Sequence, residues 1–331
     1  MLAQPFVYMN PMAYKLTRDS SIVVLGSSGM IGSAIVKKLS TIGHKWVLTP
    51  SHQELDLLDL NSVIKFFTEK QADIVIMAAG RVGGILENQG RPYDFISENI
   101  QMQLNVCLAA NKCKVNKVVL FGSSCMYPKN TQQPMPVSAI LSGSPEPTSL
   151  PYAISKLAGL HLALAFNNQF QSNRYIVVIP NSTFGPGDNF DVSTGHVLSV
   201  LINRFHKAKV TTAENVELWG SGTPRREFIF SDDLAEAIIF LLDCEADIYK
   251  TPVNIGVGKD YSIIELAQVI SKVVGYNGTI SWDTSKPDGA PKKLLDSSPI
   301  NNLGWRDRYG LEEGVQLTYD WFLNHEKGST I

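Results

Sequence analysis

The chain of 331 residues contains no apolar run of the roughly 18–20 residues that a membrane-spanning helix needs. Its first twenty residues lack a basic segment followed by an apolar one, so we expect no secretory signal and a cytoplasmic location. Residues 1–19 are interpreted as an N-terminal arm. The formal net charge is only −2, which gives no electrostatic reason to expect binding to nucleic acid or to an acidic membrane.

Cysteine is also scarce, and its spacing excludes two common uses. The four cysteines, Cys107, Cys113, Cys125 and Cys244, show neither CxxC spacing nor a matching pair of histidines. We therefore expect no metal site and no disulfide framework. Three of them are interpreted as ordinary reduced thiols. Cys125 lies beside two serines and a tyrosine in FGSSCMYPKN, where it is either a small core residue or an acid–base group.

Short apolar segments alternate with helical patterns in the first half of the chain. The predicted strands cover residues 21–25, 46–48, 73–77, 117–121 and 175–179, and helices are predicted at 60–69, 93–113 and 151–170. Fully apolar strands that alternate with helices indicate an α/β fold, a Rossmann-type doubly wound parallel sheet covered on both faces. Its ligand is expected beyond the carboxyl ends of the strands.

The pattern changes after about residue 181, where Gly- and Pro-rich stretches such as FGPGDNF and WGSGTPRREF begin. Further helices are predicted at 195–208, 232–242 and 263–274. We therefore predict a dinucleotide-binding domain over residues 20–180 and a smaller C-terminal α/β domain over 181–331 that mainly binds substrate.

A glycine-rich loop follows the first predicted strand. Gly26, Gly29 and Gly32 form GxxGxxG, in which the glycines allow a tight turn, close approach to a pyrophosphate and close packing of helix on strand. The following helix offers free N–H groups to phosphate. The residues expected to contact a dinucleotide lie in this loop, near the later strand ends and on the helix at 151–170: Gly26, Ser28, Gly29, Met30, Ile31, Gly32, Asp56, Leu57, Ala78, Ala79, Tyr152 and Lys156.

The end of the second strand does not by itself separate NAD from NADP. An NAD site would place a carboxylate there and an NADP site an arginine, and LTPSHQELDLLD has neither at the strand end. Ser51, His52 and Ser28 can hydrogen-bond a 2′-phosphate, or can simply form a solvated turn.

PYAISK places Tyr152 and Lys156 four residues apart on a predicted helix, which puts phenol and ammonium on one face. A lysine cation is expected to lower the phenol pKa and to fit Tyr152 for acid–base work. Ser123, at the end of a preceding strand, can donate a hydrogen bond to a substrate carbonyl. The three signals occur together and downstream of the dinucleotide loop, which favours a ketone-reducing site.

This combination resembles the extended short-chain dehydrogenase/reductases, and within them the GDP-L-fucose synthase family. The stretches that carry the resemblance cover nearly the whole chain from about residue 21: RVGGI, FGSSCMYPK, EPTSLPYAISK, FGPGDNF, GHVLSVLINRFHKA, WGSGTPRREFIFSDDLA and SKPDGAPKKLLD. The resemblance implies an NADPH-dependent enzyme that epimerises C3 and C5 of a GDP-4-keto sugar and then reduces C4. It also implies a homodimer.

Several residue roles follow from the resemblance alone. Cys125 and His196 match the family's epimerising base and acid, while Ser123 and Tyr152 hold the 4-keto oxygen. Asn99 resembles the helix asparagine that lies behind the active site. Arg204, Arg226 and Lys293 match positions assigned to the nucleotide diphosphate. Trp219 is expected either to stack near the nucleotide base or to be a core residue.

The sequence departs from the family pattern in three places. Ser28 and PSHQ stand where arginines are common, and PNSTFGP replaces a segment that usually begins PTN. ILENQGRPYDF also differs around the substrate loop. The sequence therefore leaves open a reductase or epimerase/reductase that acts on another GDP-4-keto sugar, such as one of the colitose or heptose pathways. A sugar-nucleotide dehydratase is disfavoured because Cys125 and Met126 occupy the place of its usual Asp-Glu pair.

Overall fold

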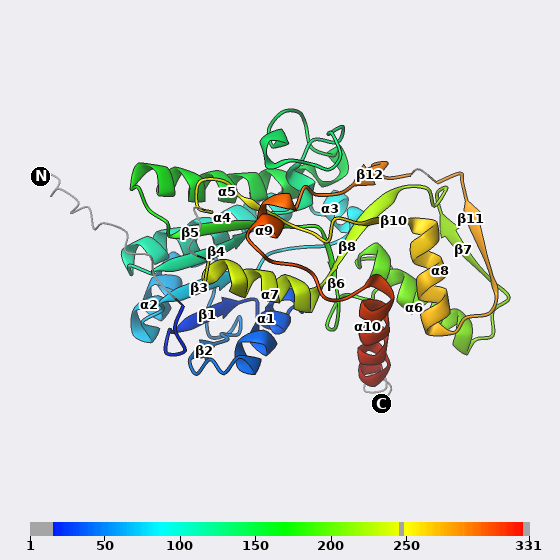
Figure 1. Cartoon of the computed structure of the whole chain (residues 1–331), viewed down its shortest axis with the longest axis horizontal. Helices are drawn as coiled ribbons and strands as arrows, with labels where there is room; N and C mark the ends of the chain where they lie inside the picture. The colour runs from blue at the N-terminus through cyan, green and yellow to red at the C-terminus, as the bar shows by residue number, and fades with distance from the viewer. Residues whose placement is uncertain (1–15, 245–247, 287, 327–331) are drawn as a thin grey trace, which may run out of the picture.

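The computed structural model describes residues 16–244, 248–286 and 288–326, and its largest sheet has six parallel strands (Figure 1). The strands stand in the order β2-β1-β3-β4-β5-β9, with the bounds β1 Ile22–Leu25, β2 Val47–Leu48, β3 Ile74–Met77, β4 Lys117–Phe121, β5 Tyr175–Pro180 and β9 Val253–Ile255. The chain turns outward from β1 to β2 and then places β3 on the other side of β1. The switch point of this doubly wound fold therefore lies between β1 and β3, directly beyond the glycine loop.

Helices cover both faces of this sheet and bury the strand side chains that point to each face. Val23 and Leu25 belong to one core with side chains of α2, α4 and α5, while Ile22 and Val24 belong to a second with α1 and α7. Successive side chains of a strand point to opposite faces, so a fully apolar strand needs two covering layers. The helix bounds are α1 Met30–Thr41, α2 Leu60–Lys70, α4 Pro92–Lys112, α5 Leu150–Gln169 and α7 Ser231–Leu242.

The remaining elements form a second region, on the right of Figure 1. Strand β8 pairs with β10, β12 and β6, and β7 pairs with β11. Helices α6, α8 and α10 pack together in a third apolar core. The bounds are β6 Ser182–Phe184, α6 Val197–Val210, β7 Asn215–Trp219, β8 Arg225–Phe230, β10 Asp260–Ser262, α8 Ile263–Val274, β11 Thr279–Asp283, β12 Lys292–Lys293 and α10 Leu311–Glu326.

Short helices fill the connections between these elements. Helix α3 spans Ile85–Gly90 after β3, and α9 spans Ser298–Asn302 beside β9. Three 3₁₀ turns, η1 Ser124–Met126, η2 Val137–Ala139 and η3 Pro147–Ser149, lie between β4 and α5. Among the described helices, none combines the length and apolarity needed to cross a membrane.

The predicted elements agree with the observed ones to within two residues at their ends. Trp46 and Asp73 lie just outside the strands expected to contain them, because strand pairing begins one residue later at Val47 and Ile74. Helix α6 begins at Val197 and not at Gly195, since His196 is its extended N-cap residue.

The chain returns to the large sheet after residue 181. Strand β9 pairs with β5, and α7 packs against α1. Both belong to the half of the sequence that was expected mainly to bind substrate, so this half also completes the large sheet and one of its covering layers. The boundary at residue 181 stays a prediction.

Candidate active site

The glycine loop is pressed between the ends of β1 and β3. Gly26 has φ +79°, and a Cβ there would lie 2.7 Å from the backbone of Ala79. A Cβ on Gly32 would lie 2.1 Å from the Gly26 carbonyl oxygen, so only glycine allows this approach of helix and loop. Gly29 is the N-cap of α1 and no side chain caps the helix. The first N–H groups of α1 are thus left for a phosphate, and the residues fit a dinucleotide.

The turn after β2 contains a carboxylate that the sequence pattern did not reveal. Glu54 accepts hydrogen bonds from the backbone N–H of Ser51 at 2.8 Å and from its hydroxyl at 2.9 Å. The Ser51 hydroxyl, considered above as a donor to a 2′-phosphate, therefore already donates its hydrogen bond to Glu54. Asp56 accepts from Leu58 N–H at 2.9 Å, and the Leu57 carbonyl accepts from Asn105 at 2.9 Å.

Ser123, Cys125 and Tyr152 converge at the carboxyl end of β4. Ser123 caps the short η1 turn, where its hydroxyl accepts from Cys125 N–H at 3.2 Å. Its side chain also hydrogen-bonds Tyr152 in the first turn of α5. The thiol of Cys125 lies within electrostatic range of that phenol and is free of any disulfide. The structure thus brings the two parts of the predicted chemistry, ketone binding and the thiol, to one place.

The expected effect of Lys156 on Tyr152 is not observed, which corrects the prediction from the sequence. Burial raises the pKa of Tyr152, the charge of Cys125 acts in the same direction, and the Ser123 hydrogen bond acts against them. The Lys156 amine lies 5.7 Å from the centroid of the Tyr152 ring. Burial lowers the pKa of Lys156 itself to about 8. Loss of hydration is therefore the main cause of both shifts, and Lys156 does not lower the pKa of Tyr152.

Asn99 supports this site from α4. Its side-chain oxygen accepts from Arg81 N–H at 3.0 Å, and its amide donates to the Arg81 and Phe95 carbonyls at 3.0 and 2.7 Å. A Cβ on Gly80 would lie 3.0 Å from the Asn99 oxygen and 3.6 Å from the Lys156 amine. Asn99 therefore fixes the turn after β3 beside Lys156, as expected of a residue behind the site.

Arg226 and Lys293 are register partners on the paired strands β8 and β12. The Arg226 guanidinium donates to the carbonyls of Arg225 and Ala290 at 2.8 and 2.6 Å, which fixes its position. Burial lowers the Arg226 pKa and the charge of Cys125 opposes this shift, so Arg226 and Cys125 lie within electrostatic range. A residue predicted to bind the diphosphate therefore lies within electrostatic range of the thiol predicted to act in epimerisation.

The other two predicted substrate residues lie together at β7. Trp219 ends this strand and is 60% exposed, which excludes the core role considered for it. Lys286 lies 5.9 Å from its ring centroid. Arg204, on α6, donates to the Glu217 carbonyl at 3.4 Å. An exposed indole beside cations is suited to stacking on a base.

His196 is the exposed N-cap residue of α6. The loop before it contacts the turn after β3, where Gly84 N–H donates to the Thr194 carbonyl at 3.0 Å. Asp188, at the start of the loop, lies within electrostatic range of His196 and accepts from the Ser199 hydroxyl. The sequence reasoning missed Asp188, although it lies inside the quoted stretch FGPGDNF.

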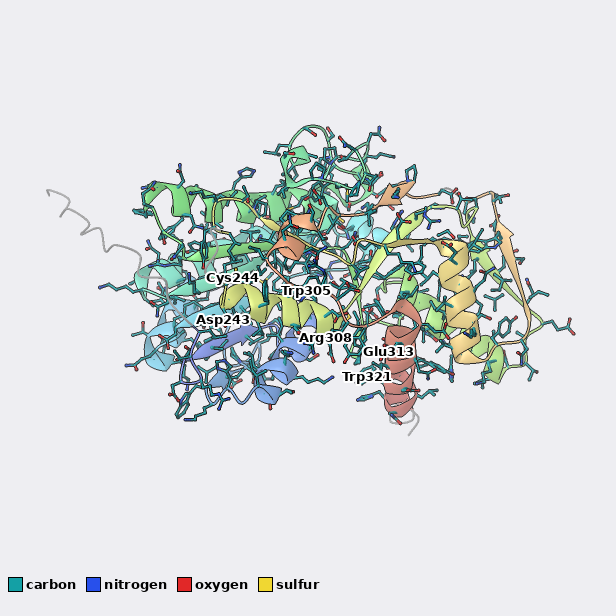
Figure 2. All side chains as sticks on the ribbon, viewed as in Figure 1. Asp243, Cys244, Trp305, Arg308, Glu313 and Trp321 are labelled. Carbon is teal, nitrogen blue, oxygen red and sulfur yellow. The ribbon has the colours of Figure 1, made fainter. Side chains whose placement is uncertain are left out.

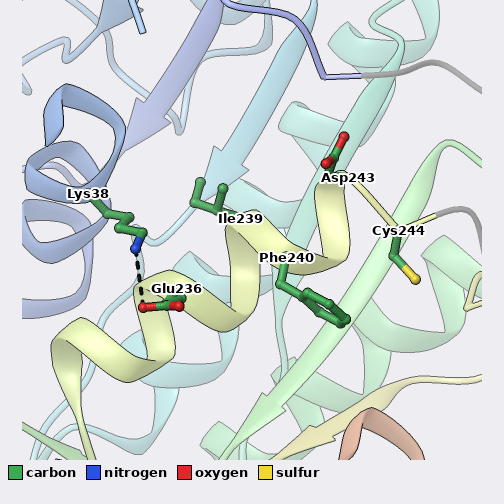
Figure 3. Close-up of a pocket in the computed structure, with 6 residues that line it drawn as sticks. All are labelled: Lys38, Glu236, Ile239, Phe240, Asp243 and Cys244. Atoms are coloured by element: carbon green, nitrogen blue, oxygen red, sulfur yellow. Dashed lines mark hydrogen bonds and ion pairs between the residues drawn. The ribbon is translucent and has the colours of Figure 1, made fainter. Parts of the chain in front are cut away.

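A hollow of about 270 Å³ lies elsewhere, between α1 and α7 (Figure 3). The Lys38–Glu236 ion pair of 3.1 Å crosses it, and Phe240 and Cys244 lie at its side. None of the predicted site residues lines it. Over the described ranges, no cluster of three or more His, Cys, Asp or Glu side chains is arranged to hold a metal.

Comparison with known proteins agrees with this geometry. Residues 22–256 match the model of the NAD dependent epimerase/dehydratase family. GDP-L-fucose synthase 1 of Arabidopsis thaliana is 44% identical over 93% of this chain and 94% of its own length. GDP-L-fucose synthase of Escherichia coli is 43% identical over 92% and 97%, and GDP-L-colitose synthase of Yersinia pseudotuberculosis is 35% identical over 92% and 98%.

Two solved structures have the same fold along nearly the whole chain. A GDP-6-OMe-4-keto-L-xylo-heptose reductase from C. jejuni gives a TM-score of 0.88 at 31% identity, covering 94% of this chain and 100% of its own. A GDP-L-fucose synthetase from Naegleria fowleri bound to NADP gives 0.85 at 27% identity, covering 95% and 97%. This chain therefore belongs to the NAD dependent epimerase/dehydratase family and, within it, to the GDP-L-fucose synthase family.

Proposed function

We propose that this protein converts GDP-4-keto-6-deoxy-D-mannose to GDP-L-fucose by epimerisation at C3 and C5 followed by reduction at C4. The observation that carries the proposal is the placement of Cys125 beside Ser123 and Tyr152. A reductase needs only the hydroxyls and Lys156. A thiol at the same carbonyl adds a group that can remove a proton from the neighbouring carbon.

The epimerisation steps are assigned to side chains of this chain. Ser123 and Tyr152 hydrogen-bond the 4-keto oxygen and stabilise the enolate that forms there. Cys125, as thiolate, takes the proton from C3 or C5, and the C–H electrons pass to the enolate. His196 returns a proton to the opposite face of that carbon. The Arg226 cation is placed to stabilise charge at the sulfur as well as to bind diphosphate.

We propose NADPH as the cofactor, held by the glycine loop, Ala78, Ala79, Tyr152 and Lys156. When bound, it supplies the hydride for C4. Tyr152 gives the 4-oxygen its proton, and Lys156 orients the cofactor ribose. The NADP-bound structure of the Naegleria fowleri relative supports this choice. Glu54 at the Ser51 turn speaks for NADH instead, because a carboxylate there suits a 2′-hydroxyl better than a 2′-phosphate. Dissociation constants for NADPH and NADH, measured side by side, test this preference.

Arg204, Arg226, Lys293 and Trp219 are proposed to bind the GDP moiety. A homodimer is proposed through the outer sides of α4 and α5, where Leu108, Leu150 and Ile154 are 45%, 38% and 40% exposed. Light scattering tests this, and a monomeric mass at micromolar concentration would contradict it.

The test of function is NADPH oxidation with GDP-4-keto-6-deoxy-D-mannose in D₂O, with deuterium expected at C3 and C5 of the product. A second candidate is a reductase of another GDP-4-keto sugar. It is favoured by the similarity to a GDP-L-colitose synthase and to a heptose reductase. Turnover of such a sugar, without turnover of the deoxymannose, would establish this second candidate.

A further inference from the structure

The loop of residues 188–195 that leads to His196 is closed on itself by hydrogen bonds. The Asp191 carboxylate accepts from the N–H groups of Ser193 and Thr194 at 2.9 and 3.0 Å. Its carbonyl accepts from Gly195 N–H at 2.8 Å, and Asn189 donates to the Thr194 hydroxyl at 2.9 Å. These bonds make the loop one unit, so a displacement at one point of it also displaces His196.

No hydrogen bond to the His196 ring is found within the described part of the chain, and the side chain is exposed. Its ring is therefore positioned by its backbone and by the charge of Asp188. The rate of proton transfer from His196 should thus depend on the contacts that hold the loop, because they set the position of the ring.

Phe190 joins the loop to α10 and α6. Its ring stacks on Trp321 of α10 at 6.0 Å and 17°, and lies 4.8 Å from the ring of Phe322 (Trp321 is labelled in Figure 2). Its carbonyl accepts from Asn203 of α6 at 2.7 Å. On the far side, Gly84 N–H bonds Thr194. The loop is therefore fastened on one side to the turn after β3 and on the other to α10.

We propose that Phe190 is a positioning residue for the epimerisation steps, and that α10 acts on catalysis by holding it. This inference rests on the proposed function of His196. Ser123 caps η1, and Tyr152 and Lys156 lie on α5, whereas the loop contacts described above reach the turn after β3, α6 and α10. Loosening the loop should slow proton return at C3 and C5 while hydride transfer to C4 continues. Ketone that has not been epimerised is then reduced, and the product ratio shifts.

The test compares Phe190→Ala and Phe190→Leu with wild type, using GDP-4-keto-6-deoxy-D-mannose and NADPH in D₂O. The expected result for Phe190→Ala is a fall in deuterium incorporation relative to NADPH oxidation on the order of tenfold to a hundredfold. A C4-reduced product without inversion should accumulate. Phe190→Leu keeps an apolar side chain against α10 and should restore most of the ratio.

Trp321→Ala removes the partner ring from α10 and carries the same expectation if Phe190→Ala does not fold. Tyr319→Phe is the matched control, since it keeps an aromatic ring on α10 and removes only the hydroxyl that hydrogen-bonds His206 of α6 at 2.9 Å. It should lower the melting temperature and leave the product ratio unchanged.

Two results distinguish a failure of the positioning role from a failure of the proposed function. Equal losses of exchange and reduction in Phe190→Ala and Trp321→Ala, with normal exchange in wild type, overturn the positioning role and leave the proposed function intact. Wild-type protein that oxidises NADPH without any exchange at C3 and C5 contradicts the proposed function, and the positioning role with it.

Discussion

Lys156 should make cofactor affinity depend on pH in a range where few other groups titrate. Its side chain is 5% exposed, and burial lowers its pKa from 10.5 to about 8. Burial is the cause of this shift, with no contribution from a neighbouring carboxylate, and the Tyr152 ring centroid lies 5.7 Å from the amine. In the proposed binding mode the ribose hydroxyls of the cofactor accept hydrogen bonds from the charged amine, so binding should favour the protonated form.

The sign and size of the effect follow from that preference. Below pH 8 the amine is already charged and affinity is constant. Above pH 8 the free protein loses this proton, so binding must restore it and the dissociation constant rises by up to about tenfold per pH unit. If binding returns the pKa of Lys156 from about 8 to 10.5, this pKa difference corresponds to about 3 kcal/mol of binding free energy.

Fluorescence titration with NADPH between pH 7 and 9.5 measures this dependence. Wild type should lose affinity above pH 8, while Lys156→Met should bind more weakly at pH 7 and show a flat profile. Lys117→Met is the control, because Lys117 is also buried with a pKa lowered to about 8 but lies at the start of β4, opposite the site. A wild-type profile that stays flat to pH 9.5, or a rise that survives in Lys156→Met, would refute the reasoning.

Three further predictions concern single side chains. Cys125→Ser should lower deuterium exchange at C3 and C5 by about a hundredfold or more by NMR, with the NADPH dissociation constant unchanged; normal exchange would make the thiol structural. Arg226→Gln should raise the KM for the GDP-sugar and slow exchange. Arg226→Lys should recover only part, since one guanidinium nitrogen already bonds the Arg225 and Ala290 carbonyls and a compact ammonium lacks the further N–H groups of the planar guanidinium for a diphosphate; wild-type kinetics in both would remove Arg226 from the site. Lys117 binds fewer protons folded than unfolded between pH 8 and 10.5, so it makes unfolding free energy rise with pH there, by up to about 3 kcal/mol. Urea unfolding of Lys117→Met should show a smaller rise, and curves parallel to wild type would contradict this.

Local patterns in the chain were enough to predict the fold class and the order of the elements. Apolar strands such as residues 22–25 and 74–77 can be recognised from local pattern because burial on two faces leaves no polar position. The glycine loop is equally local, since the close approach of Gly26 and Gly32 tolerates no side chain. The spacing of Tyr152 and Lys156 is local as well, and the family stretches added the expected roles of Cys125 and His196.

How these groups affect one another depends on the packing of the elements and could not be predicted from local patterns. The i, i+4 spacing of Tyr152 and Lys156 gave the pair but not its burial, which reverses the expected pKa shift of the phenol. The nearness of Arg226 to Cys125 and the stacking of Phe190 on Trp321 join segments about one hundred or more residues apart. Such contacts depend on how the elements pack, and no local pattern in the chain encodes the distance between two of its distant parts.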